Sequence, residues 1–181
     1  SNMASLIEAA ADPGYPAEIA LVLSNRPEVA GLERAAAAGI ATRVVDHKAF
    51  PDRRAFEERL DAALREAGAE LVCLAGFLRV LTPWFVERWS GRMLNIHPSL
   101  LPAFKGLDTH ARALAAGVPR HGCTVHFVVP ELDSGPVIAG DDEAALAARV
   151  LAEEHRLYPQ ALALVASGEV RLETETPEGR G

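Results

Sequence analysis

The sequence predicts an α/β protein with a doubly wound, mainly parallel sheet and helices on both faces. Two observations support this prediction. Short apolar runs, such as residues 19–24 and 71–75, alternate with longer stretches of helical periodicity. Strands that are apolar throughout are buried on both faces, and intervening helices supply the crossovers that make neighbouring strands parallel. At 181 residues the chain has the usual size of one domain, so we expect a single domain over residues 1–181.

Each strand is predicted from a short apolar or alternating run. In chain order these runs occupy residues 19–24, 42–45, 71–75, 93–96, 124–129, a short run beginning at 137, and 170–173. The run at 71–75 is apolar throughout, which favours a strand buried on both faces. The run at 170–173 is followed by a polar tail, which favours an edge strand.

The helices are predicted from periodicity and from residues that begin or end helices. The expected helices are 3–11, 28–38, 52–67, 82–89, 109–116 and 141–166. Gly39 and Gly68 follow two of them, and glycine adopts the left-handed conformation that ends many helices. Thr82 and Pro83 suit an N-cap and a first helical position. Pro159 should kink or divide the last helix, because proline removes a helical N–H donor.

Charge and composition argue against several functional classes. The net charge of −7 argues against a basic nucleic-acid surface, so we expect no nucleic-acid partner. No apolar run approaches the roughly 18 residues of a membrane span, and no signal-peptide pattern opens the sequence. We therefore expect a cytoplasmic protein without membrane contacts. The cysteines lack C-x-x-C spacing and no two histidines have H-x-x-x-H spacing, so we expect no metal.

Polar residues gather after three of the predicted strands, at residues 76–81, 95–99 and 130–135. Ligands of open parallel sheets bind beyond the carboxyl ends of the strands. Asn95 and His97 point to the same side of their strand, because strand side chains alternate. An Asn amide can donate hydrogen bonds to an oxyanion, and an imidazole can transfer protons near neutral pH. This pair is therefore the candidate catalytic centre.

Asp133 lies in a loop constrained by Gly135 and Pro136 and can be held near His97. A carboxylate beside an imidazole favours the protonated ring and fixes its orientation. Two alternatives remain open: His97 can cap a loop, and Asp133 can serve only to form a turn. His126 lies in an alternating strand and can either line the same crevice or belong to the core.

Together these segments resemble the folate-dependent formyltransferases, and among them the enzymes that formylate glycinamide ribonucleotide. The matching segments follow one another along nearly the whole chain, at residues 75–81, 95–102, 106–110, 121–128, 131–138 and 154–159. The resemblance implies a Rossmann-like formyltransferase fold. It implies transfer of a formyl group from 10-formyltetrahydrofolate, the co-substrate, to the amino group of glycinamide ribonucleotide in de novo purine biosynthesis, without a metal.

The resemblance also implies roles for individual residues. Asn95, His97 and Asp133 match the catalytic residues: Asn95 with His97 would stabilise the oxyanion, and His97, tuned by Asp133, would manage protons. The implied folate contacts are Arg53, Leu78, Arg79, Val80, Leu81 and Asn95. The implied substrate contacts are Ser1, Asn2, Met3 and Ala4 at the phosphate and Glu154 near the ribose.

The sequence departs from the family pattern in several places. It begins within the Gly-rich turn that follows the family's first strand, and a segment is absent between Ala139 and Gly140. We expect the sequence to be part of a longer protein. Ala103 and Asp108 stand where many relatives carry Lys and His, so neither is assigned a chemical role.

Three alternative functions are weighed. Formyltetrahydrofolate deformylase and another folate-dependent formyltransferase, such as the methionyl-tRNA enzyme, share the catalytic residues but carry additional domains. A non-catalytic folate- or nucleotide-binding module is disfavoured because all three catalytic residues are present. The expected partners are the small molecules glycinamide ribonucleotide and reduced folate, and a homodimer is left open.

Overall fold

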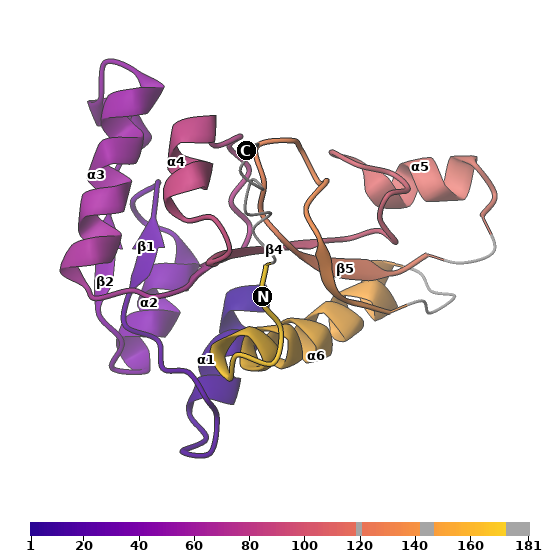
Figure 1. Cartoon of the computed structure of the whole chain (residues 1–181), viewed down its shortest axis with the longest axis horizontal. Coiled ribbons are helices and arrows are strands. Elements are labelled where there is room, and N and C mark those ends of the chain that lie inside the picture. The colour runs from indigo at the N-terminus through magenta and orange to yellow at the C-terminus, as the bar shows by residue number, and fades with distance from the viewer. Residues whose placement is uncertain (119–120, 142–146, 173–181) are drawn as a thin grey trace, which may run out of the picture.

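The computed structural model describes residues 1–118, 121–141 and 147–172, whose strands form two sheets in the middle of the molecule (Figure 1). In the smaller sheet, β1 (Val22–Ser24) and β2 (Thr42–Val44) pair in parallel. In the larger sheet the strand order is β3-β4-β5-β6. These strands are β3 (Val72–Leu74), β4 (Met93–His97), β5 (Cys123–Phe127) and β6 (Val137–Asp141).

Strand direction differs within the larger sheet. β3 and β4 are parallel, as expected. β5, in contrast, is antiparallel to β4, and β6 is antiparallel to β5. The chain between β4 and β5 runs out with α5 (Thr109–Ala115) to one end of the sheet instead of crossing over a face (Figure 1). A single loop then joins β5 to β6 as a hairpin, and hairpin neighbours are antiparallel.

Helices cover both faces of the larger sheet, which confirms the predicted α/β class (Figure 1). One face packs on α1 (Asn2–Ala10) and α6 (Ala147–Ala166), and the other on α3 (Arg53–Glu66) and α4 (Pro83–Arg88). Each large apolar side chain buried in this way stabilises the fold by about 1.5–3 kcal/mol. The first core includes Leu6, Leu94, Ile96, Val125, Phe127, Tyr158 and Leu162, and the second includes Phe56, Leu60, Phe85, Trp89 and Met93.

The alternation of β4 between these two cores determines where the site lies. Leu94 and Ile96 point into the core with α1 and α6, whereas Met93 points into the core with α3 and α4. Asn95 and His97 therefore share the face of Met93 and follow it toward the carboxyl end of the strand. Polar side chains thus begin where this apolar core ends.

The predicted helices are all present in the described residues, and the helix expected over 28–38 is α2 (Ala30–Ala37). The short helix η1 (His47–Ala49) has no counterpart among the predicted helices. Two boundaries need correction. Asp141 belongs to β6 and not to the last helix, whose expected residues 142–146 lie outside the described residues. The expected strand at 170–173 does not form over its described residues, because Val170 donates its N–H to Leu164 O and closes α6.

Two predicted local features take a different form. Thr82 precedes α4, but its hydroxyl accepts no N–H from the helix and instead donates to Glu57, whose buried carboxylate also accepts the Thr82 N–H at 2.9 Å. α6 continues as one helix through Pro159. A mid-helix proline costs about 3 kcal/mol, and the burial of Leu157, Tyr158 and Leu162 beside it offsets this cost.

The Tyr158 hydroxyl lies 2.8 Å from Leu74 O on β3 and 3.1 Å from Leu94 O on β4. This contact fixes α6 across both strands, and it holds Glu154, one turn earlier, in a defined place. Within the described residues, none of the helices is sufficiently long and apolar to span a membrane.

Candidate active site

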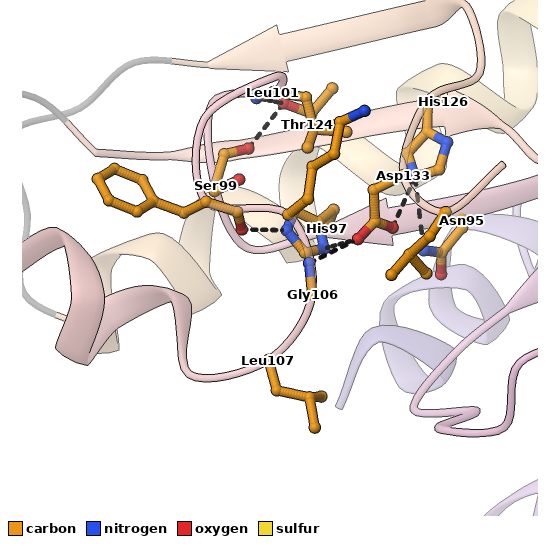
Figure 2. A network of polar contacts seen from close by, with 12 residues as sticks. Asn95, His97, Ser99, Leu101, Gly106, Leu107, Thr124, His126 and Asp133 are labelled. Atoms are coloured by element: carbon orange, nitrogen blue, oxygen red, sulfur yellow. Dashed lines mark hydrogen bonds and ion pairs between the residues drawn. The ribbon is translucent and has the colours of Figure 1, made fainter.

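The candidate site is built from two neighbouring strands at the carboxyl end of β4 (Figure 2). The antiparallel register pairs Asn95 with His126 and His97 with Thr124. Directly paired residues of antiparallel strands project from the same face of the sheet. The register thus gathers an amide, two imidazoles and a hydroxyl on one face, as Figure 2 shows. The predicted pair of Asn95 and His97 therefore shares this face with His126 and Thr124.

Both ring nitrogens of His97 face protein groups. Nε2 lies 2.9 Å from Phe104 O, and since a carbonyl only accepts, Nε2 carries a hydrogen. Nδ1 lies 3.4 Å from Asp133 Oδ2. The two side chains are only 6% and 7% exposed, so water screens this pair less than it would screen a surface pair. The structure therefore brings His97 and Asp133 together, as the sequence predicted.

Backbone contacts hold Asp133 in place. Its Oδ2 also accepts the Gly106 N–H at 2.9 Å. Asp133 has a φ of 47°, a left-handed conformation that Asp tolerates better than most residues. Two residues later, Gly135 packs so tightly that a Cβ there would lie 1.7 Å from Phe127 O. The loop after β5 can approach the strand only because residue 135 has no side chain.

Replacing Gly135 with Ala is expected to displace this loop and to lower the free energy of unfolding by at least about 1–3 kcal/mol, the usual cost of overpacking. Urea-induced unfolding measures this change. Gly140→Ala is the matched control, because a Cβ at residue 140 would meet only Cys123 O at 3.7 Å and Thr124 Oγ1 at 4.0 Å. Equal stability of the two variants would contradict the prediction.

Thr124 organises the loop that follows His97. Its Oγ1 donates to Ser99 O at 2.7 Å and accepts the Leu101 N–H at 3.1 Å. The Ser99 hydroxyl in turn donates to Ala103 O at 2.6 Å. These bonds place Phe104 O against His97. Lys105 Nζ, which donates to Ser134 Oγ at 2.5 Å, then joins this loop to the loop that carries Asp133.

His126 is the functional candidate that the sequence left unresolved. Its Nε2 lies 3.5 Å from Asn95 Nδ2 and 3.8 Å from Asp133 Oδ1, so the ring touches two of the three predicted catalytic side chains. Its Nδ1 lies 2.9 Å from Phe127 O. Burial lowers the pKa of His126, which keeps the ring neutral near pH 7. Only the antiparallel register of β5, which the sequence pattern did not give, could have placed it there.

The predicted folate contacts lie on the loop after β3 and at the start of α3. Arg53 Nη1 donates to Val80 O at 3.0 Å, which fixes this loop. Leu78 and Val80 are 83% and 58% exposed and offer apolar surface. Arg79 Nε is buried and has no hydrogen-bond partner. The Leu81 side chain is only 9% exposed and packs in the core with α3 and α4, so a ligand would meet its backbone.

Some of the predicted substrate-contact residues lie next to one another. Asn2 Nδ2 donates to Glu154 Oε2 at 2.9 Å, so the start of α1 and the middle of α6 come together. Ser1 and Ala4 line a cavity of about 730 Å³ between these helices. The Met3 side chain points away, because its Cε lies 3.4 Å from where a Cβ of Gly31 in α2 would stand.

His155 is a residue to which the sequence analysis gave no role. It lines the same cavity as Ser1, and its Nε2 is buried without a hydrogen-bond partner. Asn2 Oδ1 shares this property. Buried polar atoms are nearly always paired, so two orphans near the start of α1 indicate a place for a polar ligand. In the parts of the chain that the structure describes, no three His, Cys, Asp or Glu side chains are grouped to hold a metal ion.

Comparison with known proteins places this geometry in a family. The family model for formyl transferases matches residues 1–162. Phosphoribosylglycinamide formyltransferase from Escherichia coli (strain K12) is 42% identical over 180 residues, which cover 95% of this chain and 85% of that protein. The trifunctional purine biosynthetic protein adenosine-3 of Homo sapiens is 48% identical over 180 residues, and the chain spans 18% of its length.

The solved structures agree with the sequence comparisons. The crystal structure of phosphoribosylglycinamide formyltransferase from Brucella melitensis matches with a TM-score of 0.87 at 49% identity, covering 93% of this chain and 91% of that one. At this similarity the two chains share one fold, and the predicted Rossmann-like formyltransferase fold is confirmed. The chain belongs to the formyl transferase family.

Proposed function

We propose that this chain transfers the formyl group of 10-formyltetrahydrofolate to the amino group of glycinamide ribonucleotide. The observation that carries the proposal is the grouping of half-buried Asn95 with the buried side chains of His97 and Asp133 at the carboxyl end of β4. It is supported by the names of relatives that the chain matches over most of their length, such as the Escherichia coli enzyme. A cytoplasmic location and a homodimer stay predictions.

In this reaction 10-formyltetrahydrofolate supplies the formyl group. Asn95 Nδ2 donates an N–H toward the formyl oxygen, where negative charge develops as the amine attacks the formyl carbon. A new C–N bond forms and the bond from the formyl carbon to folate breaks. The attacking amine loses one proton and the departing folate nitrogen gains one. His97 takes up and returns this proton at Nδ1, beside Asp133 Oδ2, and no other reactant is required.

We infer that folate binds between the loop after β3 and the loop that carries Asp133. Leu78 and Val80 would contact its rings, and Leu81 would contribute backbone groups. Arg79, whose Nε is buried without a partner, and Arg53 would meet its polar atoms. Asn95 would lie at the junction of this pocket with the second substrate.

We further propose that the ribonucleotide binds at the start of α1. Ser1, Asn2, Met3 and Ala4 would offer the phosphate a helix N-terminus, where unpaired backbone N–H groups favour anions. Met3 would contribute only its backbone, because its side chain packs against α2. Glu154 would meet the ribose hydroxyls, and the unpartnered His155 Nε2 supports a polar ligand in this place.

The domain prediction also becomes a proposal: residues 1–181 form one formyltransferase domain. α1 contacts both α2, beside the smaller sheet, and α6, on the larger sheet, which links the two sheets. In the described residues β1 pairs only with β2, and β3 pairs with β4 alone. The first strand of the family fold, placed between β1 and β3, would join the two sheets. The family segment that this sequence lacks would fall between Ala139 and Gly140 in β6, and these two residues pair with consecutive residues of β5, Val125 and Thr124.

A formyl-transfer assay tests the function. We expect loss of the formyl group from 10-formyltetrahydrofolate only when glycinamide ribonucleotide is present, together with formation of the formylated ribonucleotide. Loss of the formyl group without an acceptor would identify a deformylase instead. Folate binding without any loss would indicate a binding module and would contradict the proposal. His97→Ala, assayed in parallel, excludes a contaminating activity.

A further inference from the structure

His126 has a place in the site that its family resemblance did not assign. It is the direct cross-strand partner of Asn95, and its Nε2 lies 3.5 Å from Asn95 Nδ2. The His126 side chain is only 3% exposed, whereas Asn95 is half-buried. Figure 2 shows the His126 ring next to Asn95 and Asp133, with dashed lines marking both contacts. The ring therefore contacts the amide from the protein interior.

The hydrogen on the His126 ring has only one good position. Nδ1 lies 2.9 Å from Phe127 O, which can only accept, so Nδ1 carries the hydrogen. Two charged or titratable groups face this ring from neighbouring elements: Asp133 favours its protonation and His97 opposes it. Burial outweighs both and lowers the pKa of His126, so the ring is neutral near pH 7. In this tautomer Nε2 presents a lone pair.

A lone pair on Nε2 determines how the Asn95 amide is oriented. If Asn95 turned its oxygen toward Nε2, two acceptors would face each other without a hydrogen between them. With Nδ2 toward Nε2, one N–H is used by His126 and the second N–H of the same nitrogen is left for a ligand. The ring thus selects between two amide orientations that are nearly identical in shape.

We propose that His126 is a positioning residue that holds the Asn95 amide with its nitrogen, and not its oxygen, toward the reacting formyl oxygen. This inference rests on the proposed function. His126 touches neither substrate and acts through Asn95. A correctly oriented donor is worth about 10²–10³-fold in turnover at an oxyanion site, so the orientation matters for the rate more than for binding.

Two variants of His126 separate orientation from packing. His126→Gln offers an amide oxygen that can accept from Asn95 Nδ2, whereas His126→Leu offers no acceptor. We expect His126→Leu to lower kcat about 10²-fold and to change either KM by less than about threefold. We expect His126→Gln to recover kcat to within about tenfold of the parent. Equal losses in the two variants, or losses in KM instead of kcat, would overturn the proposal.

A double-mutant cycle with Asn95→Ala supplies the sharper test. If His126 acts through Asn95, His126→Leu costs less than about threefold in kcat once Asn95 is already Ala. If the ring acts independently, the same change costs as much in Asn95→Ala as in the parent, and the proposal fails. Thermal unfolding of all four proteins identifies a variant that has lost its fold, and His126→Phe, which also lacks an acceptor, then replaces His126→Leu in the cycle.

The pH profile and NMR add readouts that packing does not affect. Below the lowered pKa of His126 the ring gains a hydrogen on Nε2, can no longer accept from Asn95, and turns to Asp133 Oδ1 at 3.8 Å. The kcat of the parent should therefore fall more steeply toward acid pH than that of His126→Gln. The ¹⁵N shifts of His126 should show Nδ1 protonated and Nε2 unprotonated at neutral pH; the opposite tautomer would overturn the inference. A parent without formyl transfer would refute the proposed function, while the tautomer still decides the state of His126.

Discussion

His97→Ala is expected to lower kcat by about 10³-fold while the Kd for folate changes by less than about threefold. Proton transfer by a positioned side chain contributes about 10²–10⁴-fold, and His97 Nδ1 lies 3.4 Å from Asp133, nearer than the other imidazole of the site. The folate pocket lies between the loop after β3 and the loop that carries Asp133; the Gly106 N–H and the close packing of Gly135 still hold the second loop when the ring is removed. Steady-state kinetics and fluorescence titration of folate measure the two quantities.

The matched control for this variant is His47→Ala. His47 lies in η1, where its Nδ1 is 2.9 Å from Asn25 O, far along the chain from every residue of the proposed centre. Removing an imidazole there should leave kcat within about twofold of the parent. The assignment of His97 is wrong if both variants turn over at the same rate, or if the loss in His97→Ala lies entirely in folate affinity.

The sequence could predict Asn95 and His97 as a pair because a strand has a period of two, and this period needs no tertiary information. It could not place His126. Residue 126 stands opposite residue 95 only because β5 runs antiparallel to β4, and strand direction depends on the route of the chain through α5. An apolar alternation reads the same in both directions, so the pattern of residues 124–129 left the core and the crevice equally open.

For Asp133, too, the sequence could predict one feature and not another. Its loop could be recognised from Gly135 and Pro136, but its contact with His97 depends on the close approach of Gly135 to Phe127 O. Local rules failed where a buried group competed with them. Thr82 has the residue type of a helix cap, yet its hydroxyl donates a hydrogen bond to the buried Glu57 carboxylate. Leu81, a folate contact implied by the resemblance, packs its side chain in the core with α3 and α4, which its residue type alone did not indicate.

These observations give Asp133 a central electrostatic place. Its Oδ2 faces His97 Nδ1 and the Gly106 N–H, and its Oδ1 faces His126 Nε2 at 3.8 Å. One carboxylate thus lies against the proton-handling ring, the loop after β4 and the ring that orients Asn95. Because it is only 7% exposed, its charge acts on both rings with little screening by water.

Asp133→Asn is therefore expected to lower kcat about 10²–10³-fold without disturbing the fold. Asn tolerates the left-handed φ of 47° at this position, and its amide oxygen can still accept the Gly106 N–H. The loss comes from the missing negative charge beside His97 Nδ1. The same change should lower the pKa of His126 further, because the Asp133 carboxylate favours its protonation.

Kinetics and an NMR titration of His126 measure these two effects, and Glu131→Gln is their matched control. Glu131 is an exposed carboxylate in the same loop, so its neutralisation removes an equal charge without touching either ring. We expect Glu131→Gln to keep kcat within about twofold and to leave the His126 titration in place, since an exposed charge is screened by water and salt. If Asp133→Asn matched it in both measurements, the buried carboxylate would act on neither imidazole, and proton handling would have to be assigned to His97 alone.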